Sequence, residues 1–402
     1  MKPFVHVGET ETTPEEAGYR RDMLEKLDAL LDRLVETGKL TGASYIMSRD
    51  GKVFAHRAVG RLREEPDSPP LTTGAIRRIA SVTKIFTAVC ILRLAEDGTL
   101  WLDQPVGDII EEFRAKPFDR ILIRHLLTHT SGIRPDPGYY LEPYPVSWRE
   151  WSYAFGYEER TAEGSGHAGG RTAGGKPDLE HRSRWIRSIL AGPLQHEPGA
   201  AWSYSTAGYV MLGEIIRRVT GLSHEEAFRR ILLDPLGLRH TFFTVPEQLR
   251  DRVCLINDWE RTFLLRTPGP DEPPLTGGGL YSTLGDLHRF GLMLMNGGTW
   301  DGVRILGRKT VELLRRDQFP DGIYAFHWGE RTRDFHMGMG ATIGRAGEPF
   351  RGTALGHEGA GRSMLLADPE ERFVAAWFVP SNVDWLPESV INVRTMMWAG
   401  LE

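Results

Sequence analysis

Cysteine is scarce in this sequence, which has 2 cysteines among its 402 residues, at positions 90 and 254. Cys90 falls in an apolar stretch that is expected to be buried, so a disulfide framework is not predicted. No apolar run approaches the roughly 18 residues that a membrane-spanning helix needs. The first nine residues are too few and too polar for the apolar region of a signal peptide, so the sequence predicts a cytoplasmic protein.

Neither sign of charge dominates the chain. The 49 basic and 54 acidic residues are interspersed and give a net charge of −5. This balance leaves no basic footprint for nucleic acid, so we do not expect nucleic acid as a partner. The length is enough for a large core and two lobes, whereas the oligomeric state is not predicted.

Several common catalytic motifs are also missing. The sequence has no Gly-x-Ser-x-Gly elbow, no Walker loop, no dinucleotide fingerprint and no His-Glu-x-x-His zinc motif. His125 and His129 have the four-residue spacing of a helical metal pair, but the Thr and Ser residues around them fit a structural loop better. We therefore expect neither a metal nor a cofactor.

The segment Ser81-Val82-Thr83-Lys84 carries the strongest positive signal. Residues 85–95 are almost wholly apolar and are followed by Gly98, which predicts a buried helix with a glycine stop. Lys84 would then lie one turn along from Ser81, on the same face. A buried amine with a lowered proton affinity can activate a neighbouring hydroxyl. The structural alternative is a capping serine beside a lysine that extends to solvent.

Two later segments could join this pair. Tyr204 lies in a loop just before an amphipathic helical pattern at 210–219, where its phenol could project into a cleft or simply pack. Residues 355–367 and 372–379 predict a hairpin. Within it, Gly359 and Gly361 would let a ligand approach the strand backbone, and a strand N–H could serve as an oxyanion donor.

Taken together, these motifs resemble the serine β-lactamase and penicillin-binding-protein superfamily, in its class C-like branch, which includes family VIII carboxylesterases. The resemblance runs from about residue 15 to the C-terminus. The motifs that carry it are Ser81-x-x-Lys84, Tyr204-Ser205-Thr206 and His357-Glu358-Gly359, with further similarity at 123–132 and 277–286.

The resemblance implies a role for each motif. Ser81 would be the nucleophile, and Lys84 and Tyr204 would move its proton, in an order that the sequence leaves open. The N–H groups of Ser81 and Ala360 would stabilise the oxyanion. Three further residues would bind or orient the substrate: His357, Gly359 and Thr206.

Two departures from the family pattern bear on the substrate. Thr206 stands where β-lactamases usually have Asn, and His357 stands where they have Lys. A neutral imidazole is a weak partner for a substrate carboxylate, so we expect a carboxylesterase acting on small or medium acyl esters. The alternatives are a class C-like β-lactamase, a D-amino-acid peptidase or DD-carboxypeptidase, and a non-catalytic binding or scaffold member of the fold.

The chain as a whole predicts an α/β (α+β) fold. The resemblance implies an antiparallel sheet flanked by helices, with an all-helical lobe inserted. We expect residues 1–75 and 291–402 to form the α/β lobe and 76–290 the helical lobe. Thr13-Pro14-Glu15-Glu16 predicts a capping box that opens the first helix, and Asp50-Gly51 predicts a hairpin turn.

A long insertion interrupts the helical lobe at 134–185. Its first half is aromatic and its second half is rich in glycine. One hypothesis is a lid with an acyl pocket beside Ser81, and the other is surface packing with a mobile loop.

Overall fold

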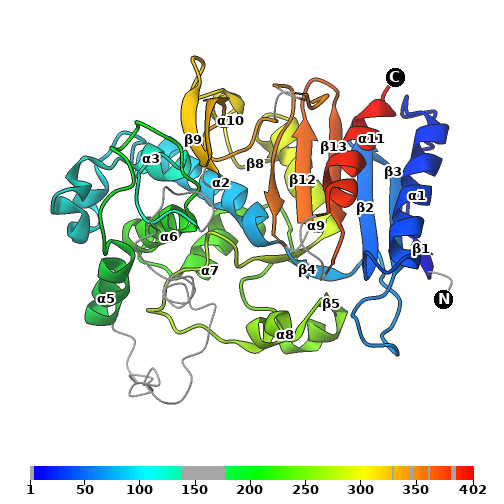
Figure 1. The fold of residues 1–402 in the computed structure, drawn as a ribbon, viewed down its shortest axis with the longest axis horizontal. Helices are drawn as coiled ribbons and strands as arrows, with labels where there is room; N and C mark the ends of the chain where they lie inside the picture. The colour runs from blue at the N-terminus through cyan, green and yellow to red at the C-terminus, as the bar shows by residue number, and fades with distance from the viewer. Residues whose placement is uncertain are drawn as a thin grey trace.

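The computed structural model describes residues 4–136, 178–327, 330–344, 347–350, 352–360, 363–381 and 386–402. A six-stranded antiparallel sheet has helices on both faces, and a largely helical region adjoins it (Figure 1). This arrangement confirms the predicted α/β fold class. The division into two lobes at the stated boundaries stays a prediction, and residues 137–177 of the aromatic and glycine-rich insertion lie outside the described residues.

The two ends of the chain build the central sheet together. Its strands, in spatial order, are β1 (Val5–Val7), β3 (Lys52–Gly60), β2 (Gly42–Arg49), β13 (Phe373–Phe378), β12 (Ser363–Asp368) and β11 (Leu355–Gly359). The N-terminal and C-terminal parts meet where β2 pairs with β13. The β2–β3 turn is the one predicted: Asp50 and Gly51 have φ values of 52° and 82°, as a tight hairpin turn requires.

Helices cover both faces of this sheet. Helix α1 (Arg21–Glu36) and helix α11 (Val393–Ala399) lie together on one face, and α9 (Leu284–Met295) lies on the other (Figure 1). The buried side chains of α1 recur at helical spacing and face the sheet. They are Leu27, Leu30, Leu31 and Leu34. The face under α9 joins a hydrophobic core that extends into the helical region.

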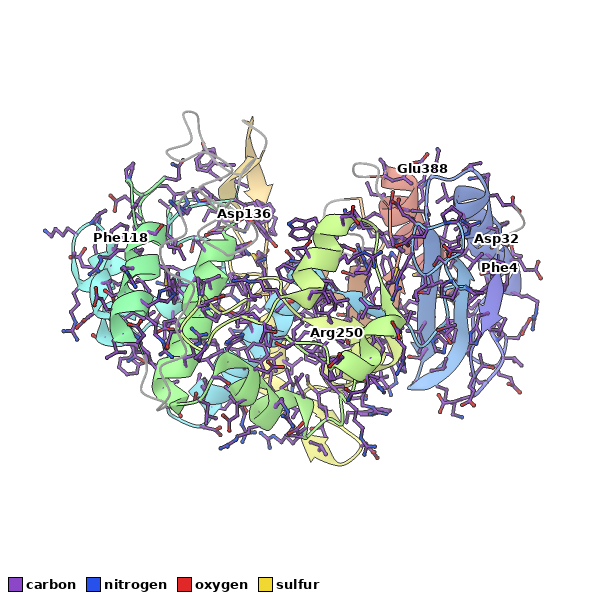
Figure 2. All side chains as sticks on the ribbon, turned by 90° about the horizontal axis from the view of Figure 1, so that it is seen from below. Phe4, Asp32, Phe118, Asp136, Arg250 and Glu388 are labelled. Carbon is purple, nitrogen blue, oxygen red and sulfur yellow. The ribbon has the colours of Figure 1, made fainter. Side chains whose placement is uncertain are left out.

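The helical region is built around α2 (Thr83–Glu96), which is buried along most of its length. The other α-helices among the residues described in this region are α3 (Ile123–Leu127), α5 (Leu179–Ile189), α6 (Thr206–Thr220), α7 (His224–Phe228), α8 (Asp258–Leu265) and α10 (Arg308–Arg315). The remaining strands are β4 (Ile76–Arg78), β5 (Val253–Cys254), β6 (Tyr281–Thr283), β7 (Thr299–Trp300), β8 (Val303–Arg304), β9 (Ile323–His327) and β10 (Glu330–Phe335). Asp136 lies in this region, well away from Phe4 and Asp32, which lie at one end of the molecule, whereas Phe118 lies at the other end (Figure 2).

The predicted capping box forms but does not open the first helix. Glu16 accepts hydrogen bonds from the backbone N–H and the hydroxyl of Thr13, at 3.1 and 3.0 Å. These bonds close a separate turn, and α1 begins at Arg21 instead. The capping motif is satisfied locally, but the chain must first bring Tyr19 into the core beneath α11, so it turns before the helix starts.

The structure gives no helix, within the described ranges, that combines the length and apolar character needed to cross a bilayer.

A buried ion pair anchors the strand that leads to Ser81. Arg77 on β4 is fully buried and donates two hydrogen bonds to the carboxylate of Glu260 on α8, at 2.5 and 2.7 Å. Arg77 also donates to the carbonyl of Cys254 on β5, at 2.9 Å. The pair therefore ties β4 to two neighbouring elements.

Removing one partner of this pair should be strongly destabilising. Glu260→Ala leaves the Arg77 guanidinium buried without its carboxylate, and we expect a loss of about 3–5 kcal/mol in the free energy of unfolding. Urea denaturation measures this loss in the free energy of unfolding. The matched control is Glu15→Ala, which breaks the exposed pair with Arg21 and should leave the midpoint nearly unchanged. Equal midpoints for the two variants would contradict the anchoring role.

Candidate active site

Ser81 lies at the junction between the sheet edge and the helical region. It is the middle residue of a short 3₁₀ turn, Ala80–Val82, that runs directly into α2. The preceding residue, Ala80, has a φ of 44°, a left-handed conformation that is uncommon for a residue with a side chain. Ser81 is half-buried. Such local strain beside a partly exposed hydroxyl is typical of functional positions.

Lys84 lies one turn along, as the spacing predicts, and is fully buried. Its Nζ is 3.1 Å from Ser81 Oγ, 2.6 Å from the carbonyl oxygen of Gly277 and 3.2 Å from Thr206 Oγ1. Three segments that are remote in sequence therefore surround one amine. The alternative of a lysine that extends to solvent is wrong, because the side chain points into the protein.

The environment of Lys84 favours its neutral form. Burial, with a smaller contribution from the charge of Arg78, lowers the pKa of Lys84 from its ordinary value to about 7. The carboxylate of Asp136 acts in the opposite direction. An amine with this pKa is partly unprotonated at neutral pH and can accept the proton of a neighbouring hydroxyl.

The Tyr204 ring lies against the same amine. The distance from Lys84 Nζ to the centre of the ring is 4.7 Å, and the ring of His129 lies 4.4 Å from it, centre to centre. Like Ser81, Tyr204 is half-buried. The structure thus brings Ser81, Lys84 and Tyr204 together in one place.

The residues around His129 hold the Tyr204 loop in position. The backbone N–H of Ser203 donates to the His129 carbonyl, and that of Ser205 donates to His129 Nδ1, both at 3.0 Å. Ser205 then caps α6 by accepting from the N–H of Gly208 at 3.1 Å. On the other side of the loop, Trp202 pairs with Ala325 of β9. The segment 123–132 therefore supports the loop that carries Tyr204.

His129 and His125 do not share a helical face. Helix α3 ends at Leu127, and His129 lies beyond it with a φ of 55°. His125 instead accepts a hydrogen bond from the N–H of Leu122 at 3.2 Å. Across the described residues, no group of three or more His, Cys, Asp or Glu side chains is placed to hold a metal ion.

The end of β11 packs against the turn that carries Ser81. A side-chain carbon at Gly359 would lie 2.2 Å from the carbonyl oxygen of Ile79, and Ser363 Oγ donates to that same oxygen at 2.8 Å. Glycine at 359 is thus required by the contact between strand and turn, and its predicted role in letting a ligand approach the strand stays a prediction. Ala360 follows at the exposed end of the strand.

His357 is buried on β11 and stays neutral at pH 7. Burial, together with the nearby charge of Lys84, lowers the pKa of His357 to about 3. Its Nδ1 lies 2.6 Å from the Glu358 carbonyl, so this nitrogen carries the hydrogen, and Nε2 is an acceptor with no hydrogen-bond partner among the described residues. The Tyr204 and His357 rings are 6.3 Å apart.

Asp136 was not among the residues predicted from the sequence. Its carboxylate accepts hydrogen bonds from the backbone N–H and the hydroxyl of Thr206, at 2.6 and 2.7 Å. Its own N–H donates to the Tyr204 carbonyl at 2.7 Å. Nothing in the sequence distinguishes Asp136 from other acidic residues near the start of the insertion, because its partners lie about 70 positions away.

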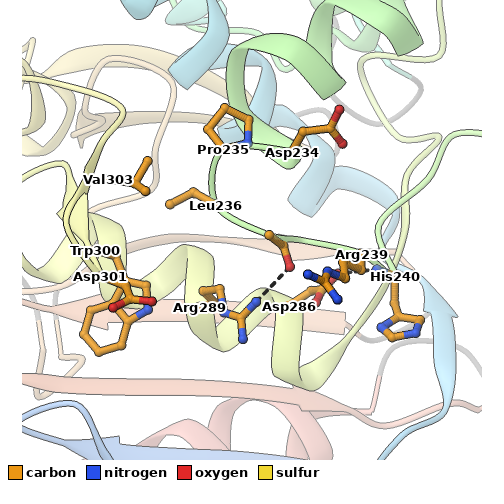
Figure 3. Close-up of a pocket in the computed structure, with 11 residues that line it drawn as sticks. Asp234, Pro235, Leu236, Arg239, His240, Asp286, Arg289, Trp300, Asp301 and Val303 are labelled. Atoms are coloured by element: carbon orange, nitrogen blue, oxygen red, sulfur yellow. Dashed lines mark hydrogen bonds between the residues drawn. The ribbon is translucent and has the colours of Figure 1, made fainter.

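A separate cavity of about 540 Å³ contains none of these residues (Figure 3). Arg239, Arg289 and Trp300 line it, and Arg289 donates to the Gly237 carbonyl at 2.8 Å. No side-chain hydroxyl or thiol lines this cavity. The arrangement around Ser81 is therefore the stronger candidate for catalysis.

Comparison with known proteins gives a consistent picture. The family model described as Beta-lactamase matches residues 27–385. "Esterase EstB" of Burkholderia gladioli is 33% identical over 230 residues, which cover 56% of this chain and 53% of that protein. The match thus spans about half the length of that relative.

Two solved structures share the fold. "Crystal structure of a family VIII carboxylesterase" matches with a TM-score of 0.68 at 19% identity, over 98% of this chain and 100% of the other. "Crystal structure of a class C beta lactamase" matches with a TM-score of 0.64 at 15% identity, over 94% and 98% of the two chains.

The protonation state of Lys84 should control the reactivity of Ser81. The rate at which a fluorophosphonate labels Ser81 should rise with pH and level off, with a midpoint near the Lys84 pKa of about 7, because the ammonium form cannot accept the serine proton. Lys84→Met should lower the plateau by on the order of 100-fold or more. Lys26→Met, at an exposed lysine that pairs with Asp22, is the control. A labelling rate that is independent of pH in the wild type would contradict this assignment.

Proposed function

The chain belongs to the beta-lactamase family of serine hydrolases, and on that premise we propose that it is a carboxylesterase that cleaves small or medium acyl esters through an acyl-enzyme. The observation that carries this proposal is the 3.1 Å contact between Ser81 Oγ and the buried amine of Lys84. A hydroxyl that faces an amine of lowered pKa is the arrangement that nucleophilic catalysis needs. The same contact argues against a non-catalytic scaffold.

The proposed reaction has two steps. Ser81 Oγ attacks the ester carbonyl carbon, and its proton passes to Lys84, the group within hydrogen-bonding distance. Tyr204, against the same amine, gives its phenol proton to the leaving alcohol as the C–O bond breaks, and Lys84 passes the proton taken from Ser81 on to Tyr204. Water then attacks the acyl-enzyme, and the same groups return the proton to Ser81.

The carbonyl oxygen becomes negatively charged in both steps. The N–H groups of Ser81 and Ala360 are the proposed donors to it, each worth about 3 kcal/mol of transition-state stabilisation. The packing of Gly359 against Ile79 supports this assignment, because it holds the end of β11 beside the turn that carries Ser81.

Two features favour an ester over a β-lactam or a peptide with a free carboxylate. His357 is neutral, because its pKa is about 3, so it offers no cation to a substrate carboxylate. Thr206 is engaged by Asp136 and Lys84, so its hydroxyl is not available to hold a substrate amide in the way that an asparagine could.

The second candidate is a class C-like β-lactamase or a D-amino-acid peptidase. The likeness to a class C β-lactamase structure over 94% of the chain supports the fold on which that chemistry occurs. The acylation groups proposed here would serve either substrate class, and the difference lies in how the substrate is held.

A paired assay separates the two candidates. We expect turnover of p-nitrophenyl butyrate to exceed turnover of a chromogenic cephalosporin by at least about 100-fold in kcat/KM, because the site offers no cation at position 357. Ser81→Ala should abolish both activities, and Ser68→Ala, at a serine in an exposed turn, is the matched control. A preference for the cephalosporin would favour the second candidate, and undiminished turnover by Ser81→Ala would refute the mechanism.

A further inference from the structure

Asp136 fixes the direction of the Thr206 hydroxyl. Its Oδ1 accepts from the Thr206 N–H at 2.6 Å, and its Oδ2 accepts from Thr206 Oγ1 at 2.7 Å. A carboxylate can only accept, so the hydrogen of the Thr206 hydroxyl must point toward Asp136. The oxygen of that hydroxyl is left with lone pairs alone for any other neighbour.

Lys84 is that neighbour, and its bonding choices are limited. Its Nζ lies 3.2 Å from Thr206 Oγ1 and 2.6 Å from the Gly277 carbonyl, and both of these oxygens can only accept from it. A neutral amine has two hydrogens and one lone pair. If the two hydrogens bond to these two oxygens, the lone pair is left for the third contact, Ser81 Oγ at 3.1 Å.

We propose that Asp136 is a positioning residue that acts through Thr206: by holding the hydroxyl hydrogen, it directs the lone pair of Lys84 onto the Ser81 hydroxyl. This inference rests on the proposed function, because it concerns the same acylation step. The proton balance is simple. The Ser81 proton moves to Lys84 Nζ, the Thr206 hydrogen stays where it is, and Asp136 exchanges no proton in this step. Burial raises the pKa of the Asp136 carboxyl, whereas the charge of Lys84 and the two hydrogen bonds from Thr206 favour its carboxylate form.

Asparagine at 136 would reverse the direction of the hydrogen bond between residue 136 and the Thr206 hydroxyl. Its amide oxygen could still accept from the Thr206 N–H, but its NH₂ group would then face Thr206 Oγ1 as a donor. The Thr206 hydrogen would turn toward Lys84 and compete with Ser81 for the lone pair. Valine at 206 would instead remove the oxygen and leave one amine hydrogen without its acceptor.

The charge of Asp136 also affects the pKa of Lys84, which gives a second, independent measurement of its role. The groups that face Lys84 are the carboxylate of Asp136, the guanidinium of Arg78, the neutral imidazoles of His129 and His357, and the rings of Tyr204 and Tyr209. Asp136 raises the pKa of Lys84, whereas Arg78 lowers it. Removing the carboxylate charge must therefore move the Lys84 pKa downward, below about 7.

The test measures the rate of Ser81 labelling by a fluorophosphonate as a function of pH. The variants are Asp136→Asn, Thr206→Val and Thr206→Ser. The matched control is Asp368→Asn, which makes the same change at a buried aspartate that also accepts from a threonine hydroxyl and an N–H, from Thr353 and Trp398. Thermal unfolding of each variant reports whether it is folded.

The expected pattern is specific to a positioning role. Asp136→Asn and Thr206→Val should each lower the plateau rate by at least about tenfold, a part of what a positioned base contributes. Asp136→Asn alone should also shift the midpoint to lower pH. Thr206→Ser should recover most of the rate that Thr206→Val loses, and the double variant should be no slower than the slower single variant.

Other outcomes would overturn the inference. These are a plateau for Asp136→Asn that matches the wild type, effects that multiply in the double variant, or the same downward midpoint shift in Asp368→Asn. If Asp136→Asn does not fold, the comparison of Thr206→Val with Thr206→Ser decides, because equal rates for those two would refute the role of the hydroxyl.

The labelling readout also separates this inference from the proposed function. Fluorophosphonates report the nucleophilicity of Ser81 whether or not an ester is the substrate. Ester turnover that is absent in the wild type would refute the carboxylesterase, while the order of labelling rates among the variants would still decide the role of Asp136.

Discussion

The burial of the Lys84 amine is the constraint on which the rest of the site depends. A buried ammonium or amine is unfavourable unless hydrogen bonds replace its hydration. Here these come from the Gly277 carbonyl, Thr206 and Ser81, which lie on three separate segments. The burial of Lys84 therefore depends on residues 81, 206 and 277 lying together. The packing of α2 in the core and the chemistry of Ser81 consequently have a common origin.

The sheet contributes to the site through its edge. Strand β11 approaches the turn before Ser81 so closely that position 359 cannot hold a side-chain carbon, and Ser363 donates to the same Ile79 carbonyl. The hydrogen bond to the Ile79 carbonyl fixes the backbone of the residue that precedes Ala80, and Ala80 itself has a positive φ. The sheet edge thus supports a conformation that an isolated turn would not favour, and it places the end of β11 beside Ser81.

The sequence predicts the parts of this structure that depend on local patterns. The helix after Ser81, the loop before α6 and the turn at Asp50-Gly51 each have a periodicity or turn signature of their own. The Thr13–Glu16 motif shows the limit of such reasoning, because its local bonds form while tertiary packing decides where α1 begins. The role of Gly277, which the sequence marks only as part of the similarity at 277–286, and the presence of Asp136 in the site escape prediction. One acts through a backbone carbonyl, and the other through a partner 70 positions away.

In the proposed reaction, Thr206 links the acylation step to the choice of substrate. An asparagine at this position carries both a donor and an acceptor, so it can bond to the lysine and still offer a group to a substrate amide. A threonine hydroxyl has one hydrogen, and here that hydrogen is donated in a hydrogen bond to Asp136. The same bond that orients Thr206 toward Lys84 therefore removes it from substrate recognition. Under the proposed function, a site built in this way would keep an activated serine and lose a contact that amide substrates need. An ester has no amide N–H to satisfy and would lose least.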